Sequence, residues 1–184
     1  CDMEVFITGG AGFIGSHAAE YYAQRGNDVV IYDNFSRSQN FYDLKRYESI
    51  ICIEGDVLDP EKLSLSLENA DLVIHAAAQT AVTVSCQDPL ADFLINAQGT
   101  LNVLEAVRQQ SKPPIVIFCS TNKVYGENVN RIPLREKTTR YEFDDSIYQF
   151  GINEKFGIDL CGHSPYGCSK LSADHYMQDY ARHY

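Results

Sequence analysis

The sequence predicts an α/β fold: a Rossmann-type, doubly wound parallel sheet with helices on both faces. Three observations lead to this prediction. Short, continuously apolar segments recur along the 184 residues, helix-forming segments separate them, and a glycine-rich turn follows the first of them. Strands that are apolar throughout are typical of a parallel sheet that is buried on both faces. The length suits a single domain of roughly 100–200 residues, which we expect to cover residues 1–184.

The five apolar segments are the predicted strands of the sheet. A first helix is expected after the glycine-rich turn, and it should end at about Arg25 because Gly26 is typical of a helix C-terminus. In the second helix, Leu63 and Leu67 fall on one face. The strands are residues 5–7, 29–32, 50–53, 72–74 and 115–118, and the second helix covers residues 60–69.

A long amphipathic helix is expected between the fourth and fifth strands, over residues 89–110. Its apolar side chains recur at spacings of three and four residues, and Pro113 and Pro114 stop it. A last helix is expected over residues 166–184. The apolar positions of the long helix are Phe93, Leu94, Ala97, Leu101, Leu104 and Val107.

Residues 127–163 interrupt the alternation of strands and helices. This segment is polar, charged and rich in turn-forming residues. An insertion of this length in a compact domain is usually functional or mobile. Its charges are most simply a solvated surface, and the rival hypothesis is a lid over the substrate.

The composition excludes some classes of function. Asp and Glu number 25 against 15 Lys and Arg, for a net charge of −10, which argues against non-specific nucleic-acid binding. No run of ~18 apolar residues is present, so no membrane-spanning helix is expected. The N-terminal residues lack the basic region of a signal peptide.

The cysteines suggest a reducing compartment. They form no CxxC pair and show no spacing typical of a metal site, so no metal is expected. A reduced, cytoplasmic protein is the interpretation that fits best. The six cysteines are at positions 1, 52, 86, 119, 161 and 168.

The glycine-rich turn is a candidate phosphate-binding site. Gly9 permits a tight turn, Gly12 lets a pyrophosphate approach the backbone, and Gly15 lets the helix pack closely on the strand. The helix N-terminus adds free N–H groups and a partial positive charge. The spacing is G-x-x-G-x-x-G rather than the standard G-x-G-x-x-G, and the alternative is an ordinary strand-to-helix turn.

Acidic residues after the next two strands are candidate contacts for an adenosine. Asp33 ends the second strand, where a carboxylate can accept hydrogen bonds from the ribose hydroxyls of adenosine. Because the same carboxylate would repel a 2′-phosphate, NAD is favoured over NADP. The alternative is a turn-forming Asp-Asn pair. Asp56 and Val57 follow the third strand and could flank the adenine, although Gly-Asp as a plain turn explains them nearly as well.

Three residues form a candidate catalytic set. Thr121 follows the fifth strand, at the sheet edge where ligands gather in open parallel sheets. Tyr166 and Lys170 are four residues apart and so share one face of the last helix. A lysine ammonium beside a phenol favours the phenolate, which can accept a proton from a substrate hydroxyl. A lone tyrosine-lysine pair is weak evidence, and its alternative is a surface pair.

Together these residues resemble the extended short-chain dehydrogenase/reductase superfamily, in particular its NAD-dependent nucleotide-sugar epimerases. The resemblance covers nearly the whole chain. The motifs that carry it are TGGAGFIG (8–15), Asp33-Asn34, Gly55-Asp56-Val57, HAAA (75–78), Asn96 within INAQGT, Ser120-Thr121 and SPYGCSK (164–170).

The resemblance implies a role for each candidate residue. Tyr166 would be the catalytic base and acid, Lys170 would assist it and hold the nicotinamide ribose, and Thr121 would be its hydroxyl partner. NAD would be the cofactor. The residues expected along it are Gly9, Gly12, Phe13, Ile14, Gly15, Asp33, Asn34, Asp56, Val57, Ala76, Ala77, Asn96, Tyr166 and Lys170.

Within the superfamily, STNKVYG (120–126) and SPYGCSK are similar to the CDP-paratose (CDP-tyvelose) 2-epimerases. A nucleotide sugar, with a CDP-sugar favoured, is therefore the expected substrate. Sugar 4,6-dehydratases carry an Asp-Glu pair after the catalytic threonine. Here those positions are Asn122 and Lys123, which cannot act as the required carboxylic acid, so a dehydratase is disfavoured.

Two alternatives stay open: a UDP-hexose 4-epimerase, and a non-catalytic NAD-binding regulatory protein of the same fold. Members of the superfamily continue well beyond the tyrosine-lysine helix with a C-terminal substrate domain, which we expect to be absent from this sequence. They often dimerise through two helices, for which residues 89–110 and the last helix are the candidates. His75 is expected to be a core or loop histidine, and His163 a loop histidine that could approach a substrate.

Overall fold

A parallel five-stranded sheet is the centre of the computed structural model, which describes residues 3–37, 44 and 46–184. Cys1 lies outside the described residues. The strand order is β3-β2-β1-β4-β5: strands are added to one side of β1 as far as β3 and then to its other side from β4. This is the predicted Rossmann-type order. The strands are β1 (Glu4–Thr8), β2 (Asp28–Asp33), β3 (Ile50–Glu54), β4 (Leu72–His75) and β5 (Ile115–Phe118).

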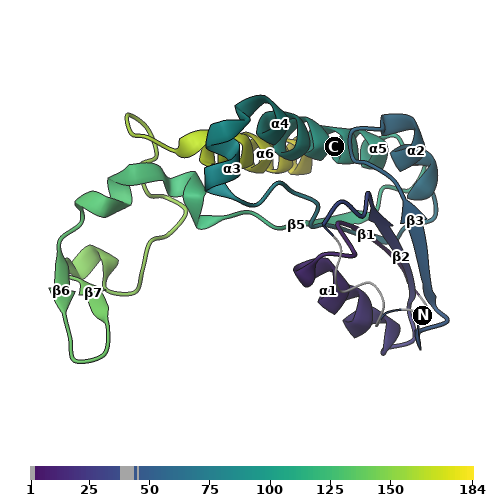
Figure 1. The fold of residues 1–184 in the computed structure, drawn as a ribbon, viewed down its shortest axis with the longest axis horizontal. Coiled ribbons are helices and arrows are strands. Elements are labelled where there is room, and N and C mark those ends of the chain that lie inside the picture. Colours follow the sequence, from purple (N-terminus) through teal and green to yellow (C-terminus); the bar gives the residue numbers. More distant parts are fainter. Residues whose placement is uncertain (1–2, 38–43, 45) are drawn as a thin grey trace.

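Helices cover both faces of this sheet (Figure 1). Alternate residues of β1 point to opposite faces, so Val5 and Ile7 pack toward helix α1, whereas Phe6 packs toward helices α2 and α5. Leu63 and Leu67 are fully buried on the second face, as predicted. The helix bounds are α1 (Phe13–Ala23), α2 (Pro60–Ser66), α3 (Val82–Gln87), α4 (Pro89–Phe93), α5 (Gly99–Arg108) and α6 (Ser164–His183).

The long helix predicted over residues 89–110 is interrupted. A π-helical turn (Leu94–Gln98) separates α4 from α5. A π turn contains one extra residue, which rotates the face of the preceding helix. Phe93 and Leu94 therefore do not share the buried face of Ala97 and Leu104, as the predicted single stripe implied: they are 50% and 37% exposed. The short helix α3 was not predicted.

The insertion 127–163 extends away from the sheet as an arm (Figure 1). It contains an antiparallel hairpin of β6 (Leu134–Glu136) and β7 (Tyr141–Phe143), and short 3-10 turns (Asn122–Arg131 and Ser146–Tyr148). Tyr148 is the centre of a small aromatic cluster, with its ring 5.7 Å from Phe156 and 6.2 Å from Phe143.

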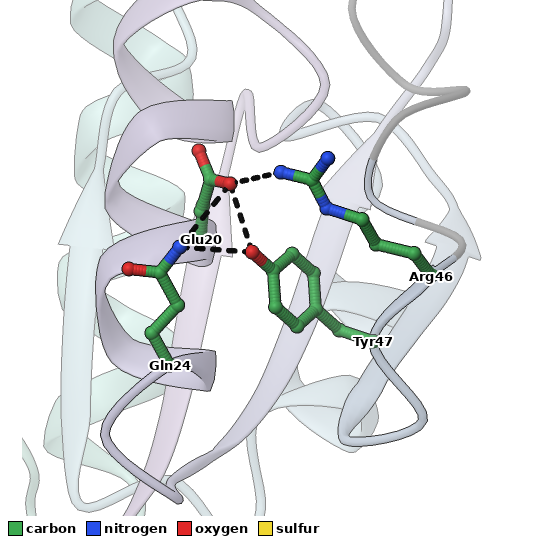
Figure 2. Close-up of polar contacts among 4 residues, drawn as sticks. All are labelled: Glu20, Gln24, Arg46 and Tyr47. Atoms are coloured by element: carbon green, nitrogen blue, oxygen red, sulfur yellow. Dashed lines mark hydrogen bonds and ion pairs between the residues drawn. The ribbon is translucent and has the colours of Figure 1, made fainter.

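A polar cluster ties α1 to the residues that precede β3 (Figure 2). The Glu20 carboxylate accepts hydrogen bonds from Arg46 and from the Tyr47 hydroxyl, and Gln24 donates to the same hydroxyl at 2.9 Å. The pKa of Glu20 is lowered by these hydrogen bonds from Tyr47 and Arg46. The cluster fastens the segment before β3 to α1.

Among the described residues, no helix is both long and apolar enough to cross a lipid bilayer.

Candidate active site

The glycine turn wraps the N-terminus of α1 against two neighbouring strand ends. Gly9 has φ +65°, and a Cβ there would lie 2.6 Å from the Ala77 nitrogen, so only glycine allows this approach. A Cβ on Gly15 would lie 2.2 Å from the Gly9 carbonyl oxygen. No side chain caps the helix at Gly12, so its first N–H groups are available to an anion.

A cavity of about 660 Å³ opens in front of this turn. Eleven of the predicted cofactor residues line it: Gly9, Gly12, Phe13, Ile14, Gly15, Asp33, Asn34, Asp56, Val57, Ala76 and Ala77. Its volume lies in the range of small-molecule and cofactor sites, about 300–1,000 Å³. The cavity sits at the carboxyl ends of β1, β2, β3 and β4, where a doubly wound sheet binds its ligand.

Asp33 fixes the cavity wall beside the turn. Its Oδ2 accepts a hydrogen bond from the Ala11 nitrogen at 3.0 Å, and its Oδ1 accepts one from the Phe35 nitrogen at 2.8 Å. Asn34 donates to the Asp56 carboxylate at 3.0 Å, which joins the loops after β2 and β3. The Tyr32 hydroxyl donates to the Asp56 carbonyl oxygen at 3.0 Å.

Sequence reasoning missed several residues that line the cavity. Arg37 is the only basic one among the described residues there, and it donates to the Thr80 hydroxyl, across the cavity, at 3.3 Å. Arg37 could have been found from the sequence, because it is a basic residue shortly after Asp33. Gly55 and Ala78 belong to motifs quoted above but were not assigned to the cofactor. The remaining residues gave no signal: Tyr32, Ser36, Gln79, Thr80, Val84 and Ile95.

Asn96 lies behind the cavity wall rather than in its lining. It is 1% exposed, and its Oδ1 accepts a hydrogen bond from the Gln79 nitrogen at 2.9 Å. Its Nδ2 lies 3.1 Å from both the Gln79 carbonyl oxygen and the Ser169 hydroxyl. Asn96 thus joins the loop after β4 to α6.

Thr121, Tyr166 and Lys170 lie outside the lining of this cavity. Lys170 is 3% exposed, and its Nζ donates to the Cys119 carbonyl oxygen at 2.7 Å. The Ser120 hydroxyl donates to Asp174 of α6 at 2.5 Å. These two bonds hold the loop that leads to Thr121 against α6, and Tyr166 is one helical turn before Lys170.

The N-terminus of α6 is held by two serines. The Tyr166 nitrogen donates to the Ser85 hydroxyl of α3 at 3.1 Å, and the Gly167 nitrogen donates to the Ser164 hydroxyl at 3.2 Å. Ser164 has φ +61°, a conformation that non-glycine residues rarely adopt. Tyr166 is therefore placed by side chains of two elements.

Burial lowers the pKa of the Lys170 ammonium to about 8. Cys119, Asp174 and Asp92 oppose this effect and raise it. The Phe118 ring, with its centroid 4.1 Å from Nζ, adds a cation–π contact. Lys170 is thus a buried cation that can lose its proton near neutral pH.

His75 is a core histidine, as expected. Its Nδ1 lies 2.6 Å from the Thr8 hydroxyl and its Nε2 lies 2.9 Å from the Thr100 hydroxyl. Thr100 donates its one proton to the Asn96 carbonyl oxygen, so Nε2 carries the histidine proton and Nδ1 accepts from Thr8. Burial lowers the pKa of His75 to about 3, so the ring is neutral.

His163 lies beside Gly126, in the loop that follows Thr121. A Cβ on Gly126 would lie 2.8 Å from the His163 Nε2, and this buried nitrogen has no hydrogen-bond partner among the described residues.

The part of the chain that the structure describes contains no cluster of three His, Cys, Asp or Glu side chains arranged for a metal ion.

The chain is similar to known sugar-nucleotide enzymes. Residues 5–184 match the family described as "NAD dependent epimerase/dehydratase family". The CDP-paratose 2-epimerase of Salmonella typhi is 40% identical over 98% of this chain and 53% of the relative. The UDP-glucose 4-epimerase of Erwinia amylovora is 35% identical over 98% of this chain and 49% of the relative.

Among solved structures, the NAD complex of the Thermus thermophilus UDP-glucose 4-epimerase superposes with a TM-score of 0.75 and 31% identity. The superposition covers 99% of this chain and 52% of that structure. The chain therefore spans about half the length of the curated relatives that it matches.

Proposed function

The chain belongs to the NAD dependent epimerase/dehydratase family, and on that premise we propose that it binds NAD and serves a nucleotide-sugar epimerase. The observation that carries this proposal is the pairing of two features at one edge of the sheet. One is the glycine-turn cavity with Asp33 in its wall, and the other is the buried Lys170 one turn after Tyr166.

The cavity residues fit a dinucleotide. Gly12 and the first N–H groups of α1 would bind the pyrophosphate, and Arg37 would add a positive charge near it. The Asp33 carboxylate would accept hydrogen bonds from the adenosine ribose, and Asn34 would donate hydrogen bonds to it. Asp56 and Val57 would flank the adenine. A carboxylate at Asp33 disfavours a 2′-phosphate, which supports NAD over NADP.

When bound, NAD would supply the acceptor and donor for the hydride of a sugar carbon. Tyr166 accepts the proton of the C2 hydroxyl as the hydride leaves C2, which yields a 2-keto sugar. Tyr166 gives the proton back when the hydride returns to the other face. Lys170 favours the phenolate through its charge, and Thr121 holds the substrate oxygen.

We propose a CDP-sugar as the substrate and epimerisation at C2, because the 40% identical relative is named a CDP-paratose 2-epimerase. The second candidate is a UDP-hexose 4-epimerase, favoured by the 35% identical relative of that class. A regulatory protein without catalysis would have no need of the buried Lys170 beside Tyr166.

A substrate panel tests the proposal. The full-length protein is incubated with NAD and, separately, with CDP-paratose, CDP-tyvelose, UDP-glucose and UDP-galactose, and products are separated by chromatography. We expect interconversion of the CDP-sugars. Interconversion of the UDP-hexoses alone would favour the second candidate, and no turnover of any substrate would favour the regulatory alternative.

Tyr166→Phe tests the catalytic assignment directly. We expect turnover to fall by about 10²–10⁴-fold, because the phenol oxygen that moves the proton is absent. NAD affinity should stay close to that of the unaltered protein. Tyr176→Phe on the same helix, with a 42% exposed ring, is the matched control and should keep full turnover.

We further propose that the insertion 127–163 acts as a lid over the sugar nucleotide, because it lies between Thr121 and Tyr166 in the sequence.

We also propose a cytoplasmic homodimer. Leu90 and Phe93 of α4 are 67% and 50% exposed, and they would pair with α6 across a two-fold axis. Light scattering of a Phe93→Asp variant, which should be monomeric, tests this pairing.

A further inference from the structure

We propose that Asp92 is a positioning residue, whose buried carboxylate locks the Tyr166–Lys170 turn of α6 and the Gln79 loop into one arrangement. This inference rests on the proposed function, since its consequence is for the proton-transfer residues. Neither the sequence motifs nor the lining of the cavity includes Asp92.

The Asp92 carboxylate is buried. It is 1% exposed, and no ion pair to it is formed by the described Lys, Arg or His residues. Buried carboxylates without a cation are costly unless several donors satisfy them. Asp92 therefore depends on the hydrogen bonds that surround it.

Three side chains from three segments donate to this carboxylate. The Ser169 hydroxyl of α6 lies 2.5 Å from Oδ2. Gln79 Nε2, from the loop after β4, lies 2.8 Å from Oδ1, and Asn96 Nδ2, from the π turn, lies 3.1 Å from it. One residue thus connects the cavity wall, the π turn and the catalytic helix.

The π turn explains why this acidic residue is inside. The extra residue in Leu94–Gln98 rotates α4 relative to α5, so that Phe93 and Leu94 turn outward. Asp92 and Asn96 then both face α6, within reach of Ser169. Functional sites are a common place for π turns.

Ser169 passes the constraint to the catalytic turn. It lies directly before Lys170 and in the same turn of α6 as Tyr166, and its one hydroxyl proton is donated to Asp92, so this bond holds the turn against α4. On the other side, Gln79 Oε1 accepts from the Ala81 nitrogen at 2.6 Å, which closes the loop that lines the cavity. Loss of Asp92 should loosen both connections together.

The charge of Asp92 also acts on Lys170. The titratable groups that act on Lys170 are His75 from β4, Cys119 after β5, Asp92 from α4 and Asp174 from α6. His75 is neutral, so Cys119, Asp174 and Asp92 are the groups that favour the ammonium. Burial lowers the pKa of Lys170, and Asp92 opposes that fall.

Asp92→Asn tests the proposal, because it keeps the shape but removes the charge and turns one acceptor into a donor. We expect kcat to fall by about tenfold or more with KM nearly unchanged. The alkaline limb of the kcat–pH profile should move to lower pH, because Lys170 loses its proton more easily without the Asp92 charge. A purely structural role would leave that limb in place.

Asp88→Asn is the matched control on the same helix. Asp88 caps α4 by accepting from the Ala91 nitrogen at 3.0 Å, and asparagine is an equally good cap, so kcat and its pH profile should not change. Ser169→Ala is the second variant. It keeps the carboxylate but breaks the link to α6, so kcat should fall while the alkaline limb stays.

An unchanged kcat and pH profile in Asp92→Asn would overturn the proposal. If that variant does not fold, an unchanged kcat in Ser169→Ala would do so. The proposed function is tested separately by the unaltered protein and Tyr166→Phe. Turnover that is lost in Tyr166→Phe but kept in Asp92→Asn would reject only the role of Asp92.

Discussion

Lys170 carries a buried ammonium whose charge changes within the working range of pH. Burial lowers its pKa from the ordinary 10.5 to about 8, so the cation is present below about pH 8 and is lost as the pH rises through that value. Because the proposed role of Lys170 depends on its positive charge, we expect kcat to decline above about pH 8. Steady-state rates across the pH range measure this.

Lys170→Met provides the comparison for that profile. Without an ammonium, the variant should be slow at every pH and should lack the alkaline decline. A wild-type rate that stays flat through the same range would contradict the assignment of the decline to Lys170.

Arg37 is the described basic residue that lines the glycine-turn cavity, together with the acidic Asp33 and Asp56. A dinucleotide brings two phosphate charges into this acidic surrounding. We expect Arg37→Ala to raise the dissociation constant of NAD by about tenfold, the loss of one charge-assisted hydrogen bond. Isothermal titration with NAD measures the change.

Arg25→Ala is a suitable control for this measurement. Arg25 follows α1 and its guanidinium stacks on Tyr21, on a surface away from the cavity lining. Its substitution should leave NAD affinity unchanged. Equal losses in the two variants would show that the effect of Arg37 is only general electrostatics.

Single residues were predictable from the sequence where a local motif defines them. Gly9, Gly12 and Asp33 follow strands, and the ends of parallel strands meet at one edge. Asp92 and Gln79 carried no such signal, because their places depend on contacts with α6 that are distant in the sequence.

At the scale of elements, His75 links three of them. It joins Thr8 of β1 to Thr100 of α5 from its own position at the end of β4. Its pKa is lowered to about 3 by burial, whereas an unfolded histidine titrates near 6.5. The unfolded state therefore binds one more proton between these values, and folding stability is lost as the pH falls through that window.

We expect this histidine to add about 1.4 kcal/mol per pH unit to the slope of the unfolding free energy below about pH 6. Urea unfolding between pH 7 and pH 5 measures the slope. A His75→Gln variant, which cannot be protonated, should be less stable but should have a flatter slope. Identical slopes would contradict the neutral, buried state of His75.

The helix predicted over residues 89–110 shows what the spacing of apolar residues cannot predict about a helix. Ala97, Leu104 and Val107 are buried as the spacing predicts, but the π turn changes the face of everything before it. A period of three and four residues does not reveal one extra residue. The burial of Asp92 and the exposure of Phe93 have this common cause.

The insertion 127–163 is the element proposed as a lid. Ile147 and Phe150 are 79% and 96% exposed, and such apolar side chains on an arm are suited to cover a ligand. Deletion of residues 130–160 should raise the KM for the nucleotide sugar with little loss of NAD affinity. Unchanged kinetics would reject the lid.

At the scale of the whole molecule, the strand order β3-β2-β1-β4-β5 places the cavity beside β1, where the order of strand addition switches sides. The alternation of apolar strands and helices predicted this architecture, because a parallel sheet must bury both faces. The arm was predicted only as an interruption, since its hairpin and aromatic cluster are stabilised by local contacts without a clear period.

The central claim is that the protein inverts a sugar carbon by removing and returning a hydride, with Tyr166 moving the proton. The most direct measurement is epimerisation of a CDP-sugar by the NAD-loaded, full-length protein in deuterium oxide, followed by NMR of the product. We expect inversion at C2 with no deuterium on that carbon, because the hydride does not exchange with solvent. Deuterium at the inverted carbon, or inversion elsewhere on the sugar, would contradict the account.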